Sequence, residues 1–473
     1  SLGKSVSFAT DALQTHGLWP RSGQPPRFHN RDLPSIRHQA EHSLVALQSE
    51  VFRLPPGASA KFGICLLYCD HHPNPSSPDD FNLAAHARQL AYQKLATLTP
   101  PPSNTPELPT TTQNQTLFTA PFFESEEPKF DDILVTYGEN LRHLEKDQQG
   151  LILSFFTDDG RHIVSQRKER EVLRPHGHIL RTNETWEPLE SEVSATAWMA
   201  GIFAAQLAQG HPSANRLLST ALSYLALQRA AGIRIWVEEN GQWLLLGIPT
   251  LWEISLTRCR WLYKKENIQI EISLQTNPNL SSLDFSANVT SGPPLRFLLA
   301  AHLALDDRNG RGSLNPSLQI HPNSIQIFPH PNSFVAKRFP NGFFEVETSS
   351  PELWEFRGPA TPLAPNNPQT ASEWPFLCLQ SAPTLNLSLK FHGRLLSPIS
   401  PQTNTQPFHS SIHNIIHIEN RFQNPNFSDL QKFETITPWF AHNAAIHYLS
   451  PRGLEQYSGG GWGVRDVCQG AFE

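Results

Sequence analysis

Short runs of apolar or alternating residues, each closed by proline, asparagine or glycine, recur along most of the chain at intervals of about ten residues. The clearest of these runs are Ile64–Tyr68, Leu151–Thr157, Ile233–Glu238, Trp243–Ile248, Ile268–Leu274, Leu295–Leu303, Ser324–Phe328 and Leu385–Phe391. Such runs are typical of strands, and the 41 prolines among 473 residues are unfavourable for long helices. The sequence therefore predicts a mostly β fold, built as a large β-sandwich.

Local signals add detail to this pattern. Glu239-Asn240-Gly241 lies between two of the runs and predicts a tight β-hairpin. Asp80–Ala96 has the composition of a helix, with acidic residues at its start. The alanine-rich stretch Ala195–Ala231 fits either a helix or buried strands, because its apolar residues have no clear period. Residues 97–115 and 359–373 are rich in proline and polar residues and predict surface loops.

The character of the chain changes near residue 425. Ser428-Asp429 can cap a helix that runs to about Ile436, and Thr437-Pro438 can start another. Trp439–Leu449 then has helical spacing of its apolar residues. A mostly β region is therefore expected to give way to helices at this point.

A glycine-rich motif follows the second of these helices. Between Tyr457 and Gln469 the chain carries four glycines, Trp462 and the pair Arg465-Asp466. Glycine lets the backbone approach a ligand closely, tryptophan offers a flat face, and the polar side chains supply donors and acceptors for sugar hydroxyls. This combination indicates a sugar-binding pocket. A glycine-rich turn with a structural salt bridge between Arg465 and Asp466 is the alternative interpretation.

The helix before this motif has two interpretations. Trp439, His442 or Asn443 could point into the same pocket. Alternatively the helix is amphipathic, with Trp439 and Phe440 in the core. We favour the second interpretation, above all for Phe440.

Composition and missing motifs exclude several classes of function. The net charge of −6 comes from mixed signs without a basic stripe, so no nucleic-acid partner is expected. No apolar run reaches about 18 residues, so no membrane span is expected. The chain has no phosphate-binding loop, nucleophile elbow or dinucleotide fingerprint. Asp70-His71-His72 lacks further ligands nearby, so no metal is expected.

Cysteine usage and the chain ends bear on location and completeness. The five cysteines are scattered and odd in number, which favours a reducing compartment and therefore the cytoplasm. The chain starts with serine, has Met199 as its one methionine and stops just after the glycine-rich motif. We therefore expect it to be a fragment of a longer protein.

The run from Thr437 to Gly470 resembles the start of the catalytic barrel in the phosphorylases of glycoside hydrolase family 94. The resemblance is strongest to the branch that acts on oligoglucans. Upstream segments fit the same family, namely His38–Ser49, Cys69–Pro73 with Asp79-Asp80 after it, and Leu225–Ile235. The resemblance is most specific over residues 437–470.

This resemblance implies a layout and a reaction. Family members have a β-sandwich, a helical linker and an α/α six-hairpin barrel. We therefore expect an N-terminally incomplete sandwich domain over 1–424, the linker over 425–436 and the truncated start of the barrel over 437–473. The implied reaction is inverting phosphorolysis, in which an aspartic acid protonates the glycosidic oxygen while inorganic phosphate attacks the anomeric carbon from the other face.

The resemblance also assigns a role to one residue of the glycine-rich motif. Asp466 matches the aspartate that binds the sugar in subsite −1. From the residue types around it, we expect Arg465 and Gln469 to support Asp466, and Trp462 and Tyr457 to line the pocket. The general acid and the phosphate ligands are expected downstream of residue 473. No catalytic residue is therefore expected in this chain, which should be inactive by itself.

One departure from the family pattern refines the expectation. Disaccharide phosphorylases have an arginine six residues before this aspartate, where the present chain has Gly460. That difference suits the oligoglucan branch.

The sequence thus predicts part of a phosphorylase that cleaves β-linked gluco-oligosaccharides, β-1,2 linkages first, and gives glucose 1-phosphate. Its partners would be a β-glucan oligosaccharide and phosphate, without a cofactor, and a homo-oligomer stays open. The alternatives are a non-catalytic carbohydrate-binding or assembly module and the phosphorylase-like region of a cyclic β-glucan synthase.

Overall fold

The structure is a computed structural model, and it describes fifteen parts of the chain. These are residues 5–17, 26–38, 43–59, 67–72, 77–95, 120–172, 175–182, 190–210, 215–219, 232–277, 280–305, 314–356, 376–396, 438–440 and 442. The chain divides into two compact units. Residues 1–17 and 26–113 form the N-terminal unit, and residues 18–25 and 114–473 form the sandwich unit. We predicted no boundary near residue 113 from the sequence.

The N-terminal unit has a two-stranded antiparallel sheet and one long helix. Its elements are β1 (Ser5–Asp11), α1 (Ala12–Thr15), the 3₁₀ turn Arg27–His29, β2 (Ser43–Ser49), the 3₁₀ turn Pro78–Asp80 and α3 (Phe81–Leu95). Asp11 starts α1 with a capping box, because its side chain accepts from the Leu13 amide while Gln14 accepts from the Asp11 amide. Helix α3 confirms the helix predicted over Asp80–Ala96.

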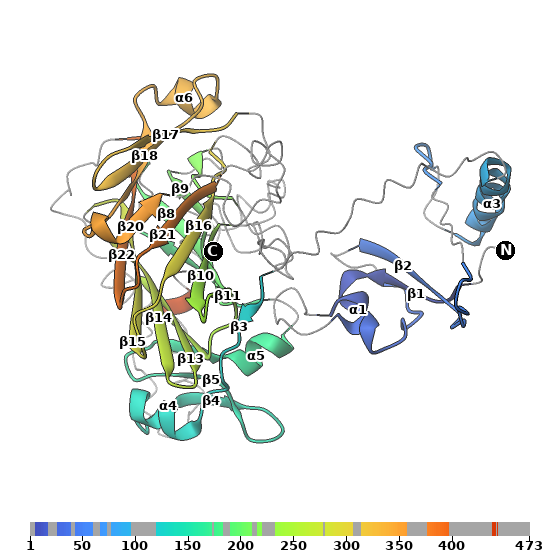
Figure 1. The fold of residues 1–473 in the computed structure, drawn as a ribbon, viewed down its shortest axis with the longest axis horizontal. Helices are drawn as coiled ribbons and strands as arrows, with labels where there is room; N and C mark the ends of the chain where they lie inside the picture. The colour runs from blue at the N-terminus through green and yellow to red at the C-terminus, as the bar shows by residue number, and fades with distance from the viewer. Residues whose placement is uncertain are drawn as a thin grey trace, which may run out of the picture. The chain divides into compact units, whose positions relative to one another are not determined.

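Three sheets make up the sandwich unit, as Figure 1 shows. The largest has eleven strands in the order β17-β18-β19-β22-β15-β14-β13-β12-β6-β5-β4, and a second has six in the order β20-β21-β16-β10-β11-β3. The third consists of β7, β8 and β9. The fold is therefore mostly β with large sheets, as predicted.

The strand bounds follow the chain. They are β3 (Phe122–Phe123), β4 (Arg142–Lys146), β5 (Ile152–Phe156), β6 (His162–Ser165), β7 (Gly177–Arg181), β8 (Val193–Trp198), β9 (Ile202–Gln209), β10 (Ile233–Glu239), β11 (Gln242–Leu246), β12 (Leu251–Ile254), β13 (Arg258–Lys265), β14 (Ile268–Asn277), β15 (Ser282–Ser291), β16 (Phe297–His302), β17 (Ser317–Ile320), β18 (Ser324–Phe328), β19 (Phe343–Glu347), β20 (Trp354–Phe356), β21 (Phe376–Ser381) and β22 (Asn386–Arg394).

Neighbouring strands of the large sheets are mostly also neighbours in sequence. Strands β12 to β15 pair successively and antiparallel, so this part of the sheet is a meander. Strand β22 departs from this order in the eleven-stranded sheet, because it lies between β15 and β19 and pairs antiparallel with both. The last strand among the described residues therefore joins two blocks that precede it in the chain.

The predicted hairpin is confirmed between β10 and β11. Glu239 pairs with Gln242, which leaves Asn240 and Gly241 as the two turn residues. Both have positive φ, at 52° and 78°, as a type I′ turn requires. Asparagine and glycine tolerate this conformation, and the sequence signal was therefore specific.

Short helices lie at the edges of the sheets. They are α4 (Phe130–Tyr137), α5 (Gln166–Glu171), α6 (Phe334–Arg338) and the 3₁₀ turn Pro351–Leu353. Helix α4 has Asp131 and Asp132 in its first turn and ends before Gly138, which has φ 81°. Its buried Ile133 packs in a small apolar cluster with Phe155 and Ile163 of β5 and β6.

The stretch left open by sequence periodicity, Ala195–Ala231, contains strands in the part that the structure describes. Strands β8 and β9 occupy its first part, and every one of their residues is buried. Because both faces of these strands are covered, their apolar residues neither alternate nor follow a helical period. They belong to one apolar core that also contains residues of both larger sheets, including Trp252, Trp261 and Phe297.

Seven of the eight runs expected as strands contain one. Only Leu67 and Tyr68 of the run Ile64–Tyr68 are described, and for them the expected strand is wrong. Both residues are exposed and lie outside any strand. Turns around Asp70 and His71 follow directly, so these residues lack the pairing partners that a strand needs. Residues 97–115, 359–373 and 425–437 lie outside the described parts of the chain, and so do the predicted domain boundaries at 425 and 437.

Candidate functional site

The five residues predicted to bind sugar, Tyr457, Trp462, Arg465, Asp466 and Gln469, lie outside the described residues. Their placement stays a prediction. The structure does describe the beginning of the run that resembles the catalytic barrel, because residues 438–440 and 442 are helical. The contacts of this short segment are therefore the part of the candidate site that can be analysed.

The segment lies against an aromatic surface of the sandwich, formed by Phe156 of β5, His162 of β6 and His178 of β7. We call these three residues the aromatic seat. The rings of Phe156 and His162 stack at 4.5 Å and 14°. Trp439 approaches the seat edge-on, with ring centroids 5.5 Å from His178, 6.3 Å from Phe156 and 6.5 Å from His162. Edge-to-face contacts at these distances stabilise aromatic pairs beyond their buried area.

His442 makes the second and more specific contact. Its ring stacks on that of His178 at 5.1 Å and 23°, and only 4% of the residue is exposed. The Nε2 atom lies 2.9 Å from the carbonyl oxygen of Ile179, and because a carbonyl only accepts, this nitrogen carries a proton. The contact therefore fixes both the position and the tautomer of His442.

The neighbour between these two residues points the other way. Phe440 is 63% exposed, so the expectation that it lies in the core is wrong. Trp439 and His442 are three positions apart and share one face of the helix, whereas Phe440 is rotated by about 100° from Trp439. The core position expected for Trp439 is confirmed, because this residue packs against the main apolar core. Asn443 lies outside the described residues.

The histidines of the seat are held uncharged at neutral pH. Burial lowers the pKa of His162 from 6.5 to about 3, and nearby Lys168 and His176 lower it further while Glu145 opposes them. Burial also lowers the pKa of His178 well below its ordinary value, and His442 adds to this effect. Uncharged imidazoles can pack as aromatic rings without the cost of burying a charge.

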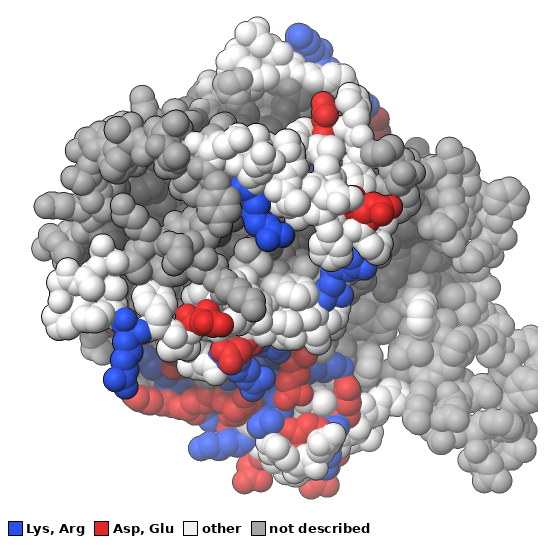
Figure 2. All heavy atoms as spheres, turned by 90° about the vertical axis from the view of Figure 1, so that its right-hand side faces the viewer, with Lys and Arg blue, Asp and Glu red and all other residues white. Residues whose placement is uncertain are grey.

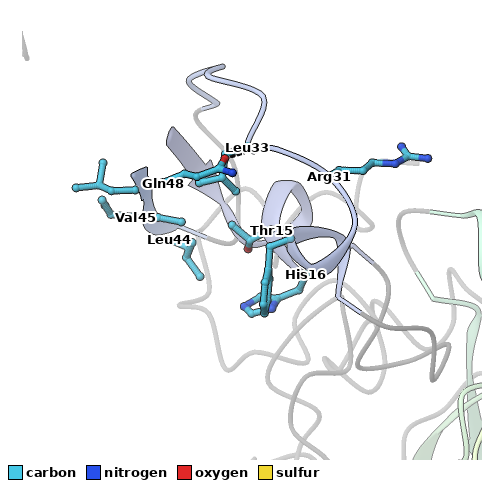
Figure 3. A pocket seen from close by; sticks show the side chains of 10 residues that line it. Thr15, His16, Arg31, Leu33, Leu44, Val45 and Gln48 are labelled. Carbon is cyan, nitrogen blue, oxygen red and sulfur yellow. Dashed lines mark hydrogen bonds between the residues drawn. The ribbon is translucent and has the colours of Figure 1, made fainter. Parts of the chain in front are cut away.

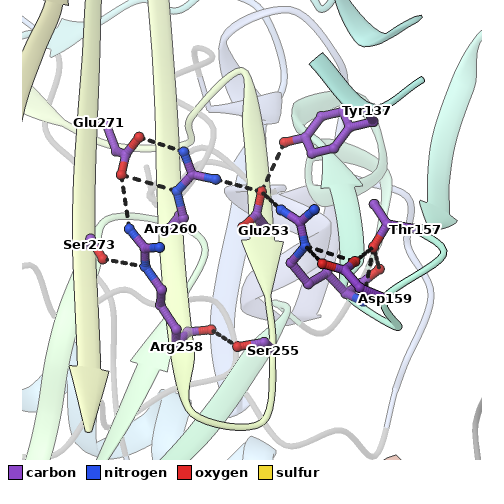
Figure 4. A network of polar contacts seen from close by, with 10 residues as sticks. Tyr137, Thr157, Asp159, Glu253, Ser255, Arg258, Arg260, Glu271 and Ser273 are labelled. Carbon is purple, nitrogen blue, oxygen red and sulfur yellow. Dashed lines mark hydrogen bonds and ion pairs between the residues drawn. The ribbon is translucent and has the colours of Figure 1, made fainter. Parts of the chain in front are cut away.

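A second cluster of polar residues lies on the face of the large sheet, between β14 and β6 (Figure 4). Arg260 bridges two carboxylates, with Nη1 2.8 Å from Glu253 Oε2 and Nη2 2.6 Å from Glu271 Oε2. Arg161 reaches Glu253 Oε2 from the other side at 3.0 Å, and the Tyr137 hydroxyl donates to the same oxygen at 3.3 Å. The carboxylates are thus occupied by protein donors, and the network ties together β12, β13, β14, the β5–β6 turn and α4.

Two hollows lie in the N-terminal unit. The first, of about 400 Å³, has Leu44 and Val45 of β2 on one side and Thr15 and His16 on the other, while Arg31 points away (Figure 3). The second, of about 490 Å³, lies beside α3 near Cys69 and His72. Their linings are mostly apolar, and neither matches the polar floor that the sequence predicts for a sugar.

Figure 2 shows positive and negative side chains interspersed on the described surface in that view. Within the described parts of the chain, no group of three or more His, Cys, Asp or Glu residues could hold a metal ion. No helix among the described residues is long and apolar enough to cross a membrane.

Comparison with known proteins finds similarity to glycoside phosphorylases. Residues 140–360 match the model of the glycoside phosphorylase supersandwich domain, and residues 1–64 match that of the SOGP N-terminal domain. The resemblance stated from the sequence is therefore confirmed at this level.

A particular relative extends the similarity to the whole chain. It is the 1,2-beta-oligoglucan phosphorylase of Listeria innocua serovar 6a, 26% identical over 479 residues. The match covers 100% of this chain and 41% of the relative, so the chain spans about two fifths of that protein. The match thus spans the residues of the predicted sugar-binding motif.

Solved structures resemble the chain only weakly. A polysaccharide lyase, BACCELL_00875, has a TM-score of 0.26 at 11% identity, covering 41% of this chain and 30% of its own. The protein HI1317 has a TM-score of 0.26 at 11% identity, covering 46% of this chain and 99% of its own. Similarity this low carries no implication for fold or function.

Sequence reasoning did not find the aromatic seat. His162 and His178 stand on strands as single histidines, which is a common arrangement without functional meaning. Trp439 and His442 lie in the run that resembles the start of the catalytic barrel, but nothing in the sequence indicates which strands they contact. That contact depends on the pairing of strands far apart in the chain.

Proposed function

We propose that the protein to which these residues belong is a phosphorylase that cleaves β-linked gluco-oligosaccharides with inorganic phosphate. The preferred linkage is β-1,2, and the product is glucose 1-phosphate. The observation that carries the proposal is the similarity of the entire chain to a 1,2-beta-oligoglucan phosphorylase, together with the match of residues 140–360 to a glycoside phosphorylase supersandwich domain.

The chemistry follows the logic of inverting glycoside cleavage. A carboxylic acid protonates the leaving glycosidic oxygen while phosphate attacks the anomeric carbon from the opposite face, which inverts the configuration there. We place both the acid and the phosphate ligands outside this chain. Among the described carboxylates, Glu253 and Glu271 are committed to arginines, so neither is a candidate for the acid.

Within this chain, the proposed contribution is sugar binding. Asp466 accepts hydrogen bonds from sugar hydroxyls in subsite −1, and Arg465 and Gln469 orient it or bind the sugar directly. Charge-assisted hydrogen bonds of this kind contribute roughly 1.5–3 kcal/mol each. Trp462 and Tyr457 line the pocket with aromatic faces.

The proposed location is the cytoplasm. Cys69, Cys259 and Cys378 are free thiols, and burial raises the pKa of Cys378 to about 12. Unpaired cysteines are typical of proteins in a reducing compartment.

The test is phosphorolysis by the complete parent protein. Purified enzyme is incubated with β-1,2-, β-1,3- and β-1,4-linked gluco-oligosaccharides, with and without phosphate, and glucose 1-phosphate is measured. We expect phosphate-dependent release, fastest from the β-1,2-linked substrate. Binding of oligosaccharide without any product would instead support a carbohydrate-binding module, and formation of cyclic glucans would support a synthase.

A further inference from the structure

The outer face of the eleven-stranded sheet, the side turned away from the main apolar core, is polar over much of its width. Leu387, Leu389 and Phe391 of β22 belong to that core, so the residues that alternate with them face outward. At the outward positions, β14, β15 and β22 carry only polar or charged side chains. Two aromatic residues near the β17 end of the sheet depart from this pattern, Phe328 of β18 and Phe343 of β19.

These two aromatic residues lie side by side in one row across the strands. Their ring centroids are 5.1 Å apart at an interplanar angle of 35°, and both residues are partly exposed. Strand pairing places Ser317 of β17 next to Phe328, and Arg394 of β22 next to Phe343. We call these four residues the aromatic row. It presents flat apolar faces on a surface that is otherwise hydrophilic.

The neighbouring row on the same face is polar on five successive strands. Pairing joins Gln319 to Gln326, Gln326 to Glu345, Glu345 to His392, and His392 to Ser282. We call these five residues the polar row. Outward positions of one strand are about 7 Å apart, so the two rows run side by side at that spacing.

The polar row is incompletely satisfied by protein partners. Gln326 Nε2 donates to Glu345 Oε1 at 3.4 Å, and Arg394 Nε lies 3.6 Å from Glu345 Oε2, both long for such contacts. At the other end of the row, His392 is 3% exposed and Ser282 0%. The His392 Nδ1 and Ser282 Oγ atoms are buried and have no hydrogen-bond partner in the described structure. Because unpaired buried polar atoms are costly, this row has hydrogen-bonding capacity left for a ligand.

We propose that the aromatic row and the polar row together form a binding platform for a β-linked gluco-oligosaccharide. The identity of this ligand rests on the proposed function. A glucose ring has an apolar C–H face that packs on an aromatic ring, and hydroxyls at its rim that require donors and acceptors beside it. Neighbouring strands are about 4.8 Å apart, so an oligosaccharide lying along the rows meets a new side chain at each strand.

A cross-strand aromatic pair can also act only within the sheet, by holding β18 and β19 in register. That role needs an apolar side chain of suitable size, whereas a sugar needs a flat ring. Two variants at one position separate these roles. Phe343→Leu keeps an apolar side chain and removes the ring, and Phe343→Tyr keeps the ring.

The experiment measures retardation in native gels that contain soluble β-1,2-glucan, without phosphate. The unmodified residue and both Phe343 variants are compared in a background that also carries Asp466→Ala, so that the predicted sugar site contributes as little as possible. We expect Phe343→Leu to raise the Kd for the glucan roughly threefold to tenfold, and Phe343→Tyr to leave it nearly unchanged. An α-1,6-linked glucan in the gel is the control ligand and should retard none of them.

Poor folding is covered by a second measurement and a second variant. Urea unfolding shows whether each variant is folded before its Kd is compared. Gln326→Ala removes a group of the polar row instead of the aromatic row, and it should also raise the Kd roughly threefold to tenfold. If Phe343→Leu does not fold, an unchanged Kd in Gln326→Ala overturns the inference.

Both the 473-residue chain and the complete parent protein are tested in this way. Equal Kd values for the unmodified residue and both Phe343 variants, in either form, overturn the inference. A parent protein that the β-1,2-glucan does not retard overturns it as well. The proposed function is judged separately by release of glucose 1-phosphate. A parent that releases none, while its retardation still depends on the ring at position 343, overturns the proposed function alone.

Discussion

Two glycines with nearly the same φ offer a direct test of how the sandwich is packed. Gly201 lies in the turn between β8 and β9 with φ 77°, and Gly241 lies in the β10–β11 hairpin with φ 78°. A Cβ atom on Gly201 would lie 2.2 Å from the Leu246 carbonyl oxygen and 2.9 Å from that of Gly247. A Cβ atom on Gly241 would meet nothing within 4 Å. The pair therefore differs in close packing and not in backbone strain.

The magnitudes follow from this difference. Gly241→Ala carries only the cost of placing alanine in the left-handed region, about 1–2 kcal/mol. Gly201→Ala carries the same cost, and the end of β11 must also move by roughly 1 Å. Forcing atoms into a packed core typically costs another 1–3 kcal/mol or somewhat more. We expect Gly201→Ala to lower the free energy of unfolding by about 2–5 kcal/mol and Gly241→Ala by about 1–2 kcal/mol.

Urea unfolding followed by tryptophan fluorescence is a suitable assay. All eleven tryptophans lie outside the N-terminal unit, so their fluorescence reports the sandwich unit. Equal m-values are required before the midpoints are compared. Equal destabilisation of the two variants would refute the close approach of the β8–β9 turn to β11.

Three further predictions concern charge and binding. The pKa of His162 is lowered from 6.5 to about 3, so the unfolded chain binds more protons than the folded chain between these two pH values. The free energy of unfolding should therefore fall on acidification below pH 6.5, by up to about 1.4 kcal/mol per pH unit. His162→Phe should flatten the plot of urea midpoint against pH. Arg181 and Glu192 form a buried bidentate ion pair with N–O distances of 2.6 and 2.9 Å. Glu192→Ala leaves the arginine charge buried without its partner and should lower the free energy of unfolding, measured in urea, by roughly 3–5 kcal/mol. The double variant Arg181→Met, Glu192→Leu removes both charges and should lower it much less. Asp466→Ala in the complete parent should lower kcat/KM by roughly 10²–10⁴-fold, and a lowered Tm with near-normal efficiency would instead indicate a structural salt bridge.

The sequence predicted what depends on local chemistry. Seven strand candidates and the Asn240-Gly241 turn were found because alternation and turn residues act over a few positions. Helix α3 was found for the same reason. Strands β8 and β9 could not be told from a helix, because complete burial on both faces removes the period that distinguishes the two.

Long-range contacts were not predictable in this way. The stack of His442 on His178 depends on bringing residues more than two hundred positions apart together, which no local pattern encodes. Phe440 illustrates the same limit, because the helical period gives the angles between side chains but not which face meets the protein. The site residues from Tyr457 to Gln469 remain predictions from the sequence and its resemblance.

The place of β22 in the large sheet has a consequence for biosynthesis. This strand (Asn386–Arg394) lies between β15 and β19, so the meander and the β17–β19 block cannot join until it has left the ribosome. Translation adds about 5–20 residues per second, and both blocks present an unpaired edge while it proceeds from β19 to β22. Chaperones that cover exposed strand edges should therefore bind nascent chains in this interval. Limited proteolysis of stalled nascent chains would show this as protection of the sheet that appears only once residue 394 has emerged; protection at shorter lengths would contradict it.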